Sequence, residues 1–215
     1  MAVSFLEVLK RGIEARIPGV VSNKLSYLDD RGEKRFLLQI ATLGKTLSIP
    51  LDSQDMLDLA PPVGTELRAF APIGRSRTDY SASIKTGMIR YSTANQPDWG
   101  GPLTEQEILD GPVFDGCAKV MGRDTYIDKR DGVSRYTATV AAMGDVFGFR
   151  DLRKELWDMI PENGVVLASG RLENDLRWTS GDASGAGRGI TSKLLIIVDV
   201  IKPYKKSLEK TNPAA

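Results

Sequence analysis

Residues 32–44 have the sequence Gly-Glu-Lys-Arg-Phe-Leu-Leu-Gln-Ile-Ala-Thr-Leu-Gly, and residues 132–144 have the sequence Gly-Val-Ser-Arg-Tyr-Thr-Ala-Thr-Val-Ala-Ala-Met-Gly. The similarity continues without a gap from residues 32–67 to residues 132–167, where 8 of 36 positions are identical. Roughly 2 identities are expected by chance at ordinary composition. Chance similarity between two β-rich halves is the alternative, but the pattern favours an internal repeat.

The ends of the two halves support the same division. Ser4 and Thr104 each begin an S/T-x-x-E pattern, which is typical of a capped helix start. The final apolar segments, residues 83–91 and 196–204, match at a larger offset, so the second half carries about 13 extra residues before its last strand. Four segments are therefore expected: a helix and first barrel over residues 1–91, a linker with a short helix over 92–112, a second barrel over 113–204 and a short basic tail over 205–215.

Each half is expected to contain three strands, one helix and two further strands. Alternating apolar residues and turn signals place these elements. In the first half the strands are residues 17–27, 35–41, 46–51, 66–72 and 81–91, with a helix over 53–59. In the second half they are residues 114–126, 133–142, 145–150, 165–172 and 191–202, with a helix over 151–160. This is the order of the OB barrel. The sequence predicts a mainly β protein with short helices, made of two tandem OB-fold-like five-stranded barrels.

Composition narrows the function classes. The 215 residues include no histidine and one cysteine, Cys117, so His-based acid–base catalysis, Cys-rich zinc sites and an intrachain disulfide are excluded. No phosphate-binding loop motif and no apolar run long enough to span a membrane is present. We expect a cytoplasmic protein that is not an enzyme, with no cofactor or metal and no membrane partner. Because the net charge is only +1, any basic binding surface must come from local clustering.

Two segments of the second half carry a family resemblance. Residues 164–172, Gly-Val-Val-Leu-Ala-Ser-Gly-Arg-Leu, and residues 190–198, Ile-Thr-Ser-Lys-Leu-Leu-Ile-Ile-Val, resemble the fourth and closing strands of bacterial and phage-type single-stranded DNA-binding proteins. The resemblance covers residues 114–203 and, through the repeat, more weakly 17–91. It implies OB barrels that bind single-stranded DNA, and a homodimer of two-barrel chains that reaches the family's usual four barrels. The sequence departs from the family at its tail, which is basic instead of acidic, and at residues 72–75, where Pro-Ile-Gly-Arg replaces Gly-Arg-Leu.

Single-strand binding needs aromatic faces for bases and cations for phosphates. The expected loop between the last two strands of the second half contains Arg177 and Trp178. The indole either contacts a base or packs against the barrel, and its place in a Gly-rich insertion favours base contact. In the first half, the corresponding loop residues are equally consistent with phosphate contact and with solvated charge. The full set of candidate nucleic-acid-binding residues is Tyr27, Arg35, Phe36, Arg75, Arg77, Tyr80, Tyr126, Lys129, Arg130, Arg135, Tyr136, Arg171, Arg177, Trp178, Arg188 and Lys193.

Two adjacent pairs in this set, Arg35-Phe36 and Arg135-Tyr136, begin expected strands. Strand neighbours point to opposite faces, so one residue of each pair is expected to face the binding groove and the other the interior, with the arginines outward. The charged residues at the hairpin tips are slightly better explained by solubility. Trp157 and Cys117 are expected in the core. The sequence favours binding of single-stranded DNA in replication, recombination or repair. The alternatives are binding of single-stranded RNA and a non-enzymatic scaffold for protein interactions, which the near-neutral charge favours. An enzyme that uses a pair of carboxylates is the least favoured class.

Overall fold

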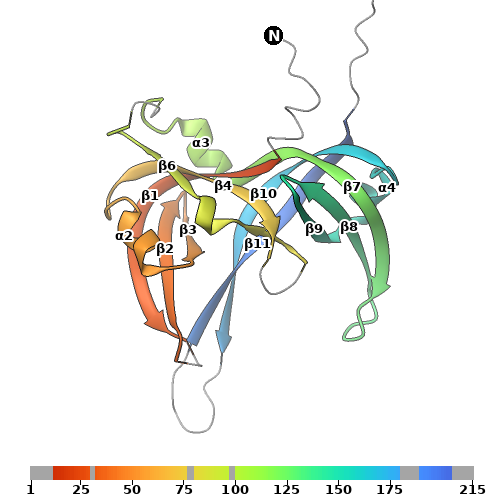
Figure 1. The fold of residues 1–215 in the computed structure, drawn as a ribbon, viewed down its shortest axis with the longest axis horizontal. Coiled ribbons are helices and arrows are strands. Elements are labelled where there is room, and N and C mark those ends of the chain that lie inside the picture. Colours follow the sequence, from red (N-terminus) through yellow and green to blue (C-terminus); the bar gives the residue numbers. More distant parts are fainter. Residues whose placement is uncertain (1–11, 30–31, 77–79, 97–99, 180–188, 205–215) are drawn as a thin grey trace, which may run out of the picture.

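The computed structural model describes residues 12–29, 32–76, 80–96, 100–179 and 189–204, without the side chains of 175–179 and 189–193. It is mainly β, with short helices at the periphery of one large sheet (Figure 1). None of the helices in these ranges is long and apolar enough to cross a membrane. The sheet divides into two groups of strands that share the same connectivity.

The first barrel has the strand order expected of an OB fold. β1 pairs antiparallel with both β2 and β4, β2 pairs with β3, and β4 pairs with β5 and β6. The bounds are β1 (Ile13–Leu28), β2 (Lys34–Thr42), β3 (Lys45–Leu51), β4 (Glu66–Arg75), β5 (Ala82–Ile84) and β6 (Arg90–Thr93). Helix α2 (Gln54–Leu59) connects β3 to β4, as predicted, and the Ser53 hydroxyl accepts a hydrogen bond from the Met56 amide at its start.

The second barrel repeats this order. β7 pairs with β8 and β10, β8 pairs with β9, and β10 pairs with β11. The bounds are β7 (Val113–Ile127), β8 (Ser134–Ala142), β9 (Asp145–Leu152), α4 (Lys154–Asp158), β10 (Gly164–Thr179) and β11 (Gly189–Pro203). The register of the first strand shifts at the same place in both barrels, between Val21 and Asn23 and between Val120 and Gly122. The fold is thus two OB-fold-like barrels, as the sequence predicts.

The core of each barrel consists of the apolar side chains at every second position of its strands. Leu38 and Ile40 of β2, like Ala138 and Val140 of β8, are fully buried, because every second side chain faces the barrel interior. Phe147 and Phe149 of β9 pack edge to face with ring centroids 5.7 Å apart. Cys117 is buried, as expected.

A direct strand contact joins the barrels. β1 pairs antiparallel with β7, from Ile13 opposite Gly116 to Arg16 opposite Val113. The approach at Gly116 is very close: its φ is 152°, and a Cβ atom there would lie 2.1 Å from the Gly12 carbonyl oxygen. Only glycine fits this position. The pairing makes the two barrels parts of one sheet.

Each barrel also contacts the third strand of the other barrel. The β4–β5 side of the first barrel contacts β9, where the Gly148 amide donates a 2.5 Å hydrogen bond to the Tyr80 carbonyl. The long β10–β11 hairpin of the second barrel extends past the first barrel (Figure 1) and contacts β3, where the Asn174 Nδ2 donates to the Thr46 carbonyl at 3.3 Å.

The linker region contains α3 (Glu105–Asp110). Its start has the predicted capping box, in which the Thr104 hydroxyl accepts from the Glu107 amide and the Glu107 carboxylate accepts from the Thr104 amide. Gly111, with φ 64°, ends the helix as predicted. The matching pattern at Ser4 lies outside the described residues.

Three predicted boundaries are wrong. Residues 174–179 form no loop, because β10 stays paired with β11 as far as Thr179 opposite Gly189, which satisfies the backbone hydrogen bonds of both strands. The single strand predicted over residues 81–91 is broken into β5, a 3₁₀ turn η1 (Thr86–Met88) and β6, because the backbone leaves the extended region at Lys85. The helix predicted over 151–160 is shorter because Leu152 still belongs to β9.

Candidate nucleic-acid interface

The second barrel has a groove on the face of β7, β8 and β9 that points away from its core. With Phe147 and Phe149 buried inward, Val146, Gly148 and Arg150 fall on the opposite face of β9. The groove has a volume of about 620 Å³, and its lining includes Thr125, Thr137 and Thr139. Strand 2 and strand 3 of an OB barrel form its usual ligand face.

Two tyrosines supply exposed aromatic surface at this groove. Tyr126, near the end of β7, is 45% exposed, and Tyr80, from the connection between β4 and β5, is 64% exposed. The Arg75 guanidinium lies 4.6 Å from the centre of the Tyr80 ring. An aromatic face beside a cation is the combination that stacks a base and attracts its phosphate.

Tyr80 belongs to the first barrel but lies in the groove of the second. Besides the hydrogen bond between Gly148 and Tyr80, Asp145 at the start of β9 anchors this connection. Its carboxylate accepts from the Arg75 amide at 2.8 Å and pairs with the Lys85 ammonium at 2.7 Å. The groove is therefore built by residues from both barrels.

The acidic groups near the groove are partly neutralised. Burial opposes ionisation of Asp145, but the hydrogen bonds from Lys85 and from the Arg75 and Val146 amides outweigh it and lower the pKa of that carboxyl group. Asp145 is thus ionised at neutral pH and paired with a cation. Asp124 also lines the groove.

The sequence predicted two residues that line this groove, Tyr80 and Tyr126, and also Arg75, which stacks on Tyr80. It missed the threonines of β8, Val146, Gly148 and Arg150. For the β9 residues the signal was present in the alternation of residues 145–150, where Phe147 and Phe149 face the core and the side chains between them therefore face the opposite side.

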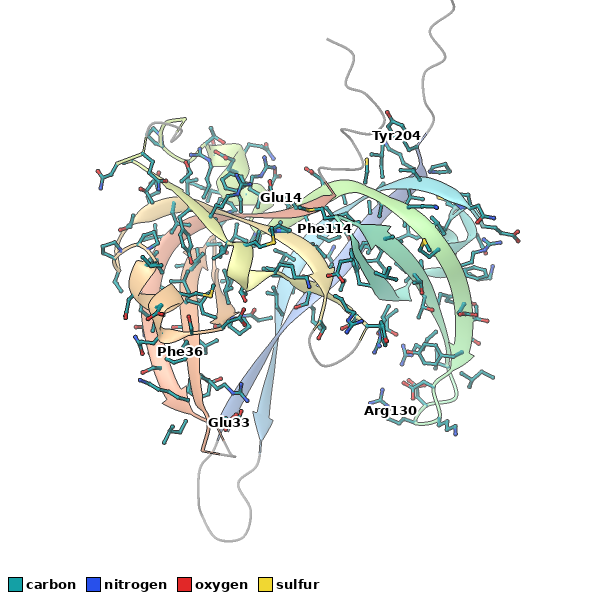
Figure 2. The ribbon with its side chains drawn as sticks, in the orientation of Figure 1. Glu14, Glu33, Phe36, Phe114, Arg130 and Tyr204 are labelled. Atoms are coloured by element: carbon teal, nitrogen blue, oxygen red, sulfur yellow. The ribbon has the colours of Figure 1, made fainter. Side chains whose placement is uncertain are left out.

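Most of the predicted arginines lie elsewhere, at hairpin tips and in ion pairs. Arg35 Nε lies 2.7 Å from Asp29 and its guanidinium also pairs with Glu33, and Arg135 lies 2.5 Å from Asp131. Arg130 lies 2.9 Å from Asp128 and lowers the pKa of that carboxyl group to about 2. Lys129 is exposed beside Arg130 at the tip of the β7–β8 hairpin, far from the tip of the β1–β2 hairpin near Glu33 (Figure 2).

The aromatic neighbours of Arg35 and Arg135 pack inward, so these two arginines point away from the cores, but neither lines the groove. Tyr136 packs against Trp157 with ring centroids 5.5 Å apart, and Phe36 packs against the core of the first barrel. The Trp157 indole donates to the Thr137 carbonyl at 3.0 Å and carries Arg123 on its face at 4.6 Å. Trp157 therefore packs against the core, as predicted, with part of its ring exposed.

The remaining candidates are on or near the β10–β11 hairpin. Arg171 pairs with Glu173 at 2.9 Å and with Asp199 at 2.5 Å, outside the groove. The backbones of Arg177, Trp178 and Lys193 lie on the far part of the hairpin, opposite Thr191, Ile190 and Asp175 respectively, while their side chains lie outside the described part of the chain. Arg77 and Arg188 lie outside the described residues altogether.

The first barrel presents a different surface at the equivalent place. By register, Ser48 corresponds to Gly148 and Thr46 to Val146. Ser48 is only 5% exposed, and β10 contributes Leu172, Glu173 and Asn174 to a smaller pocket of about 310 Å³ there. No aromatic side chain lines this pocket within the described residues. Tyr27, which corresponds to Tyr126, is 38% exposed near the end of β1.

Comparison with known proteins gives a fold likeness only. No protein-family model and no curated protein sequence matches the chain. Among solved structures, the single-stranded DNA-binding protein of Thermus aquaticus is similar at 11% sequence identity and a TM-score of 0.41, over 91% of this chain and 93% of that one. A deletion mutant of the same Thermus aquaticus protein gives 9% identity and a TM-score of 0.42, over 93% and 97%. The fold assignment above rests on strand order and register.

Proposed function

We propose that the groove of the second barrel binds single-stranded nucleic acid, DNA in the first place, with little sequence preference. One observation carries the proposal: Tyr80 and Tyr126 expose their rings at one groove, with Arg75 stacked on the first of them. A base contributes about 1–3 kcal/mol when it stacks on such a ring, whatever its identity.

The chemistry of the groove favours single strands over duplexes. Stacking on a tyrosine requires an unstacked base, and duplex DNA hides the faces of its bases. The hydroxyls of Thr125, Thr137 and Thr139 offer both donors and acceptors along the sheet face. They accommodate base or sugar groups without fixing a sequence.

Because the groove has few cationic side chains, we expect its affinity for nucleic acid to depend only modestly on salt concentration. Among the described residues, Arg150 is the cationic side chain that lines this groove, and Arg75 stacks on the Tyr80 ring. If both contact phosphates, log Kd changes with log salt with a slope of about 1.4, because each phosphate contact on a single strand contributes about 0.7. The near-neutral chain accordingly binds through stacking more than through charge.

Within this proposal the chain acts where single strands are exposed, in DNA replication, recombination or repair. It does so as a homodimer with four barrels, which the resemblance of residues 114–203 to single-stranded DNA-binding proteins suggests. A second candidate function, a scaffold for protein interactions, is favoured by the apolar ends of the two equivalent hairpins, where Leu28 is 70% and Ile127 is 67% exposed.

The test compares two equivalent tyrosines. Labelled oligo-dT is titrated with the full chain, and binding is followed by fluorescence anisotropy at about 50 and about 200 mM salt. Tyr126→Ala is expected to weaken binding about 5- to 100-fold, which corresponds to one lost stack. Tyr27→Ala, the matched variant in the first barrel, is expected to leave the affinity unchanged. Absence of binding to both oligo-dT and oligo-U at the lower salt would contradict the proposal and favour the scaffold.

A further inference from the structure

The contact between the barrels places a side chain of the first barrel in the groove of the second. Three bonds hold the segment that contains Tyr80: Lys85 Nζ to Asp145 Oδ2 at 2.7 Å, the Arg75 amide to the same oxygen at 2.8 Å, and the Gly148 amide to the Tyr80 carbonyl at 2.5 Å. Two of the three end on one carboxylate oxygen. Asp145 therefore binds Arg75 at the end of β4 and Lys85 just after β5, on either side of Tyr80.

Gly74 makes room for this arrangement. A Cβ atom on Gly74 would lie 2.6 Å from Asp145 Oδ2 and 2.3 Å from Lys85 Cε. The carboxylate and the lysine stem thus occupy space that any other residue at position 74 would fill. Lys85 and Asp145 are 37% and 29% exposed, so the pair is partly shielded from solvent.

The equivalent place in the first barrel has a residue of opposite charge. By register Asp145, opposite Ala142, corresponds to Lys45, opposite Thr42. A lysine there cannot accept the two hydrogen bonds that Asp145 accepts. The ion pair is consequently specific to the groove that carries the two exposed tyrosines.

We propose that the Lys85–Asp145 ion pair is a latch that holds Tyr80 in the groove of the second barrel, so that a single strand contacts Tyr80 and Tyr126 together. The inference rests on the proposed function and adds to it that the binding site is complete only while the two barrels are latched. Tyr80 is a binding residue in this scheme, and Asp145 and Lys85 are positioning residues that act through it.

The main test is a double-mutant cycle on oligo-dT affinity. Tyr80→Ala is expected to weaken binding about 5- to 20-fold, and Asp145→Asn, which keeps an acceptor oxygen but removes the charge, to weaken it by a similar factor. Because both variants act through one ring, the double variant is expected to be no weaker than Tyr80→Ala alone. Exchanging the charges, with Lys85→Glu and Asp145→Lys together, is expected to restore only part of the affinity, because the ion pair can re-form but the Arg75 amide has lost its acceptor.

The matched control is Asp158→Asn. It removes the same group from the exposed Lys154–Asp158 pair on α4, which spans 2.6 Å and lies outside the groove. This variant is expected to bind like the unaltered chain. Additive losses in the cycle, or an Asp145→Asn chain with full affinity, would overturn the latch.

Amide hydrogen exchange at Gly148 gives a readout that needs no DNA. The Gly148 amide is bonded to the Tyr80 carbonyl, so it is expected to be protected in the unaltered chain and to exchange faster in Asp145→Asn. Unchanged protection in the variant would overturn the latch even if DNA binds. If the unaltered chain binds no oligonucleotide, the proposed function is refuted, and with it the claim that Tyr80 and Tyr126 bind one strand together. The exchange rate of the Gly148 amide still decides whether the ion pair holds the two barrels together.

Discussion

At the level of single residues, a largely buried ion pair outside the groove ties the linker to the first barrel. Arg68 of β4 forms two hydrogen bonds to Glu107 of α3, at 2.6 and 2.7 Å, and a further bond to the Gly101 carbonyl at 2.9 Å. The side chains are 12% and 19% exposed. The hydrogen bond from Arg68 is the main reason that the pKa of Glu107 falls to about 2, and it ties the linker to the first barrel.

This pair predicts a pH-dependent stability. The folded pKa of Glu107 lies below its ordinary value of 4.5, so its ionised form stabilises the fold above about pH 4.5, and this stabilisation is lost as the pH falls towards 2. Glu107→Gln is expected to lower the free energy of unfolding at pH 7 by about 2 kcal/mol, because the amide removes the negative charge that strengthens the two hydrogen bonds from the mostly buried Arg68 guanidinium.

Urea denaturation across this pH range measures the effect. The difference between the unaltered chain and Glu107→Gln is expected to shrink as the pH falls below 4.5. Glu105→Gln, an exposed carboxylate on the same helix, serves as the control and is expected to change little. A difference that stays constant down to pH 3 would refute the role given to the ion pair.

Residue type predicted part of the candidate binding site and also suggested arginines that do not belong to it. Tyr80, Tyr126 and Arg75 were recognisable as aromatic and cationic residues near expected loops. Arg35 and Arg135 looked equally suitable, but their acidic neighbours Asp29 and Asp131 pair with them. Residue type alone does not distinguish a cation that faces a ligand from one that faces a carboxylate of its own hairpin.

At the scale of elements, the β10–β11 hairpin is the longest paired unit, and one glycine makes its bend possible. The register shifts between Ser169 and Gly170. A Cβ atom on Gly170 would lie 1.9 Å from the Ile197 carbonyl oxygen and 2.9 Å from the Phe114 ring. The bulge therefore has no space for a side chain, and it directs the hairpin past the first barrel.

Two glycines at register shifts provide a matched comparison. Gly170→Ala is expected to lower the free energy of unfolding by about 1–3 kcal/mol, the usual cost of overpacking. Gly122→Ala, at the shift in β7, is expected to be tolerated because a Cβ atom on Gly122 would meet nothing within 4 Å beyond its chain neighbours. Thermal and urea denaturation compare the two, and equal losses of stability would contradict the packing account of the bulge.

Period-two alternation was sufficient to predict most strands of both barrels within a few residues, because it reflects burial against a single core. It failed where pairing continues beyond the core. Residues 174–179 are mostly polar and precede a Gly-rich segment, which indicates a loop, yet their backbone is paired with β11. It also failed at Lys85, where the hydrogen bond from its amide to the Pro72 carbonyl, 2.8 Å long, is a tertiary contact.

At the scale of the whole molecule, the two barrels have the same strand order but different surfaces. β1 and β7 pair to make one sheet, and each barrel sends a hairpin onto the third strand of the other. The face of β9 forms part of an open groove with tyrosines, while Ser48 on the equivalent face of β3 is buried. The internal repeat reveals what the halves share, so it could not predict a site that depends on how they differ.

Amide chemical-shift mapping of the full chain with oligo-dT locates the binding face directly. The amides of Thr137, Thr139 and Gly148 are expected to shift on titration, while those of Gln39, Thr46 and Ser48 on the equivalent face of the first barrel are expected to stay unchanged. Shifts confined to the first barrel, or no shifts at saturating oligonucleotide, would contradict the assignment of the groove on β7, β8 and β9 as the binding site.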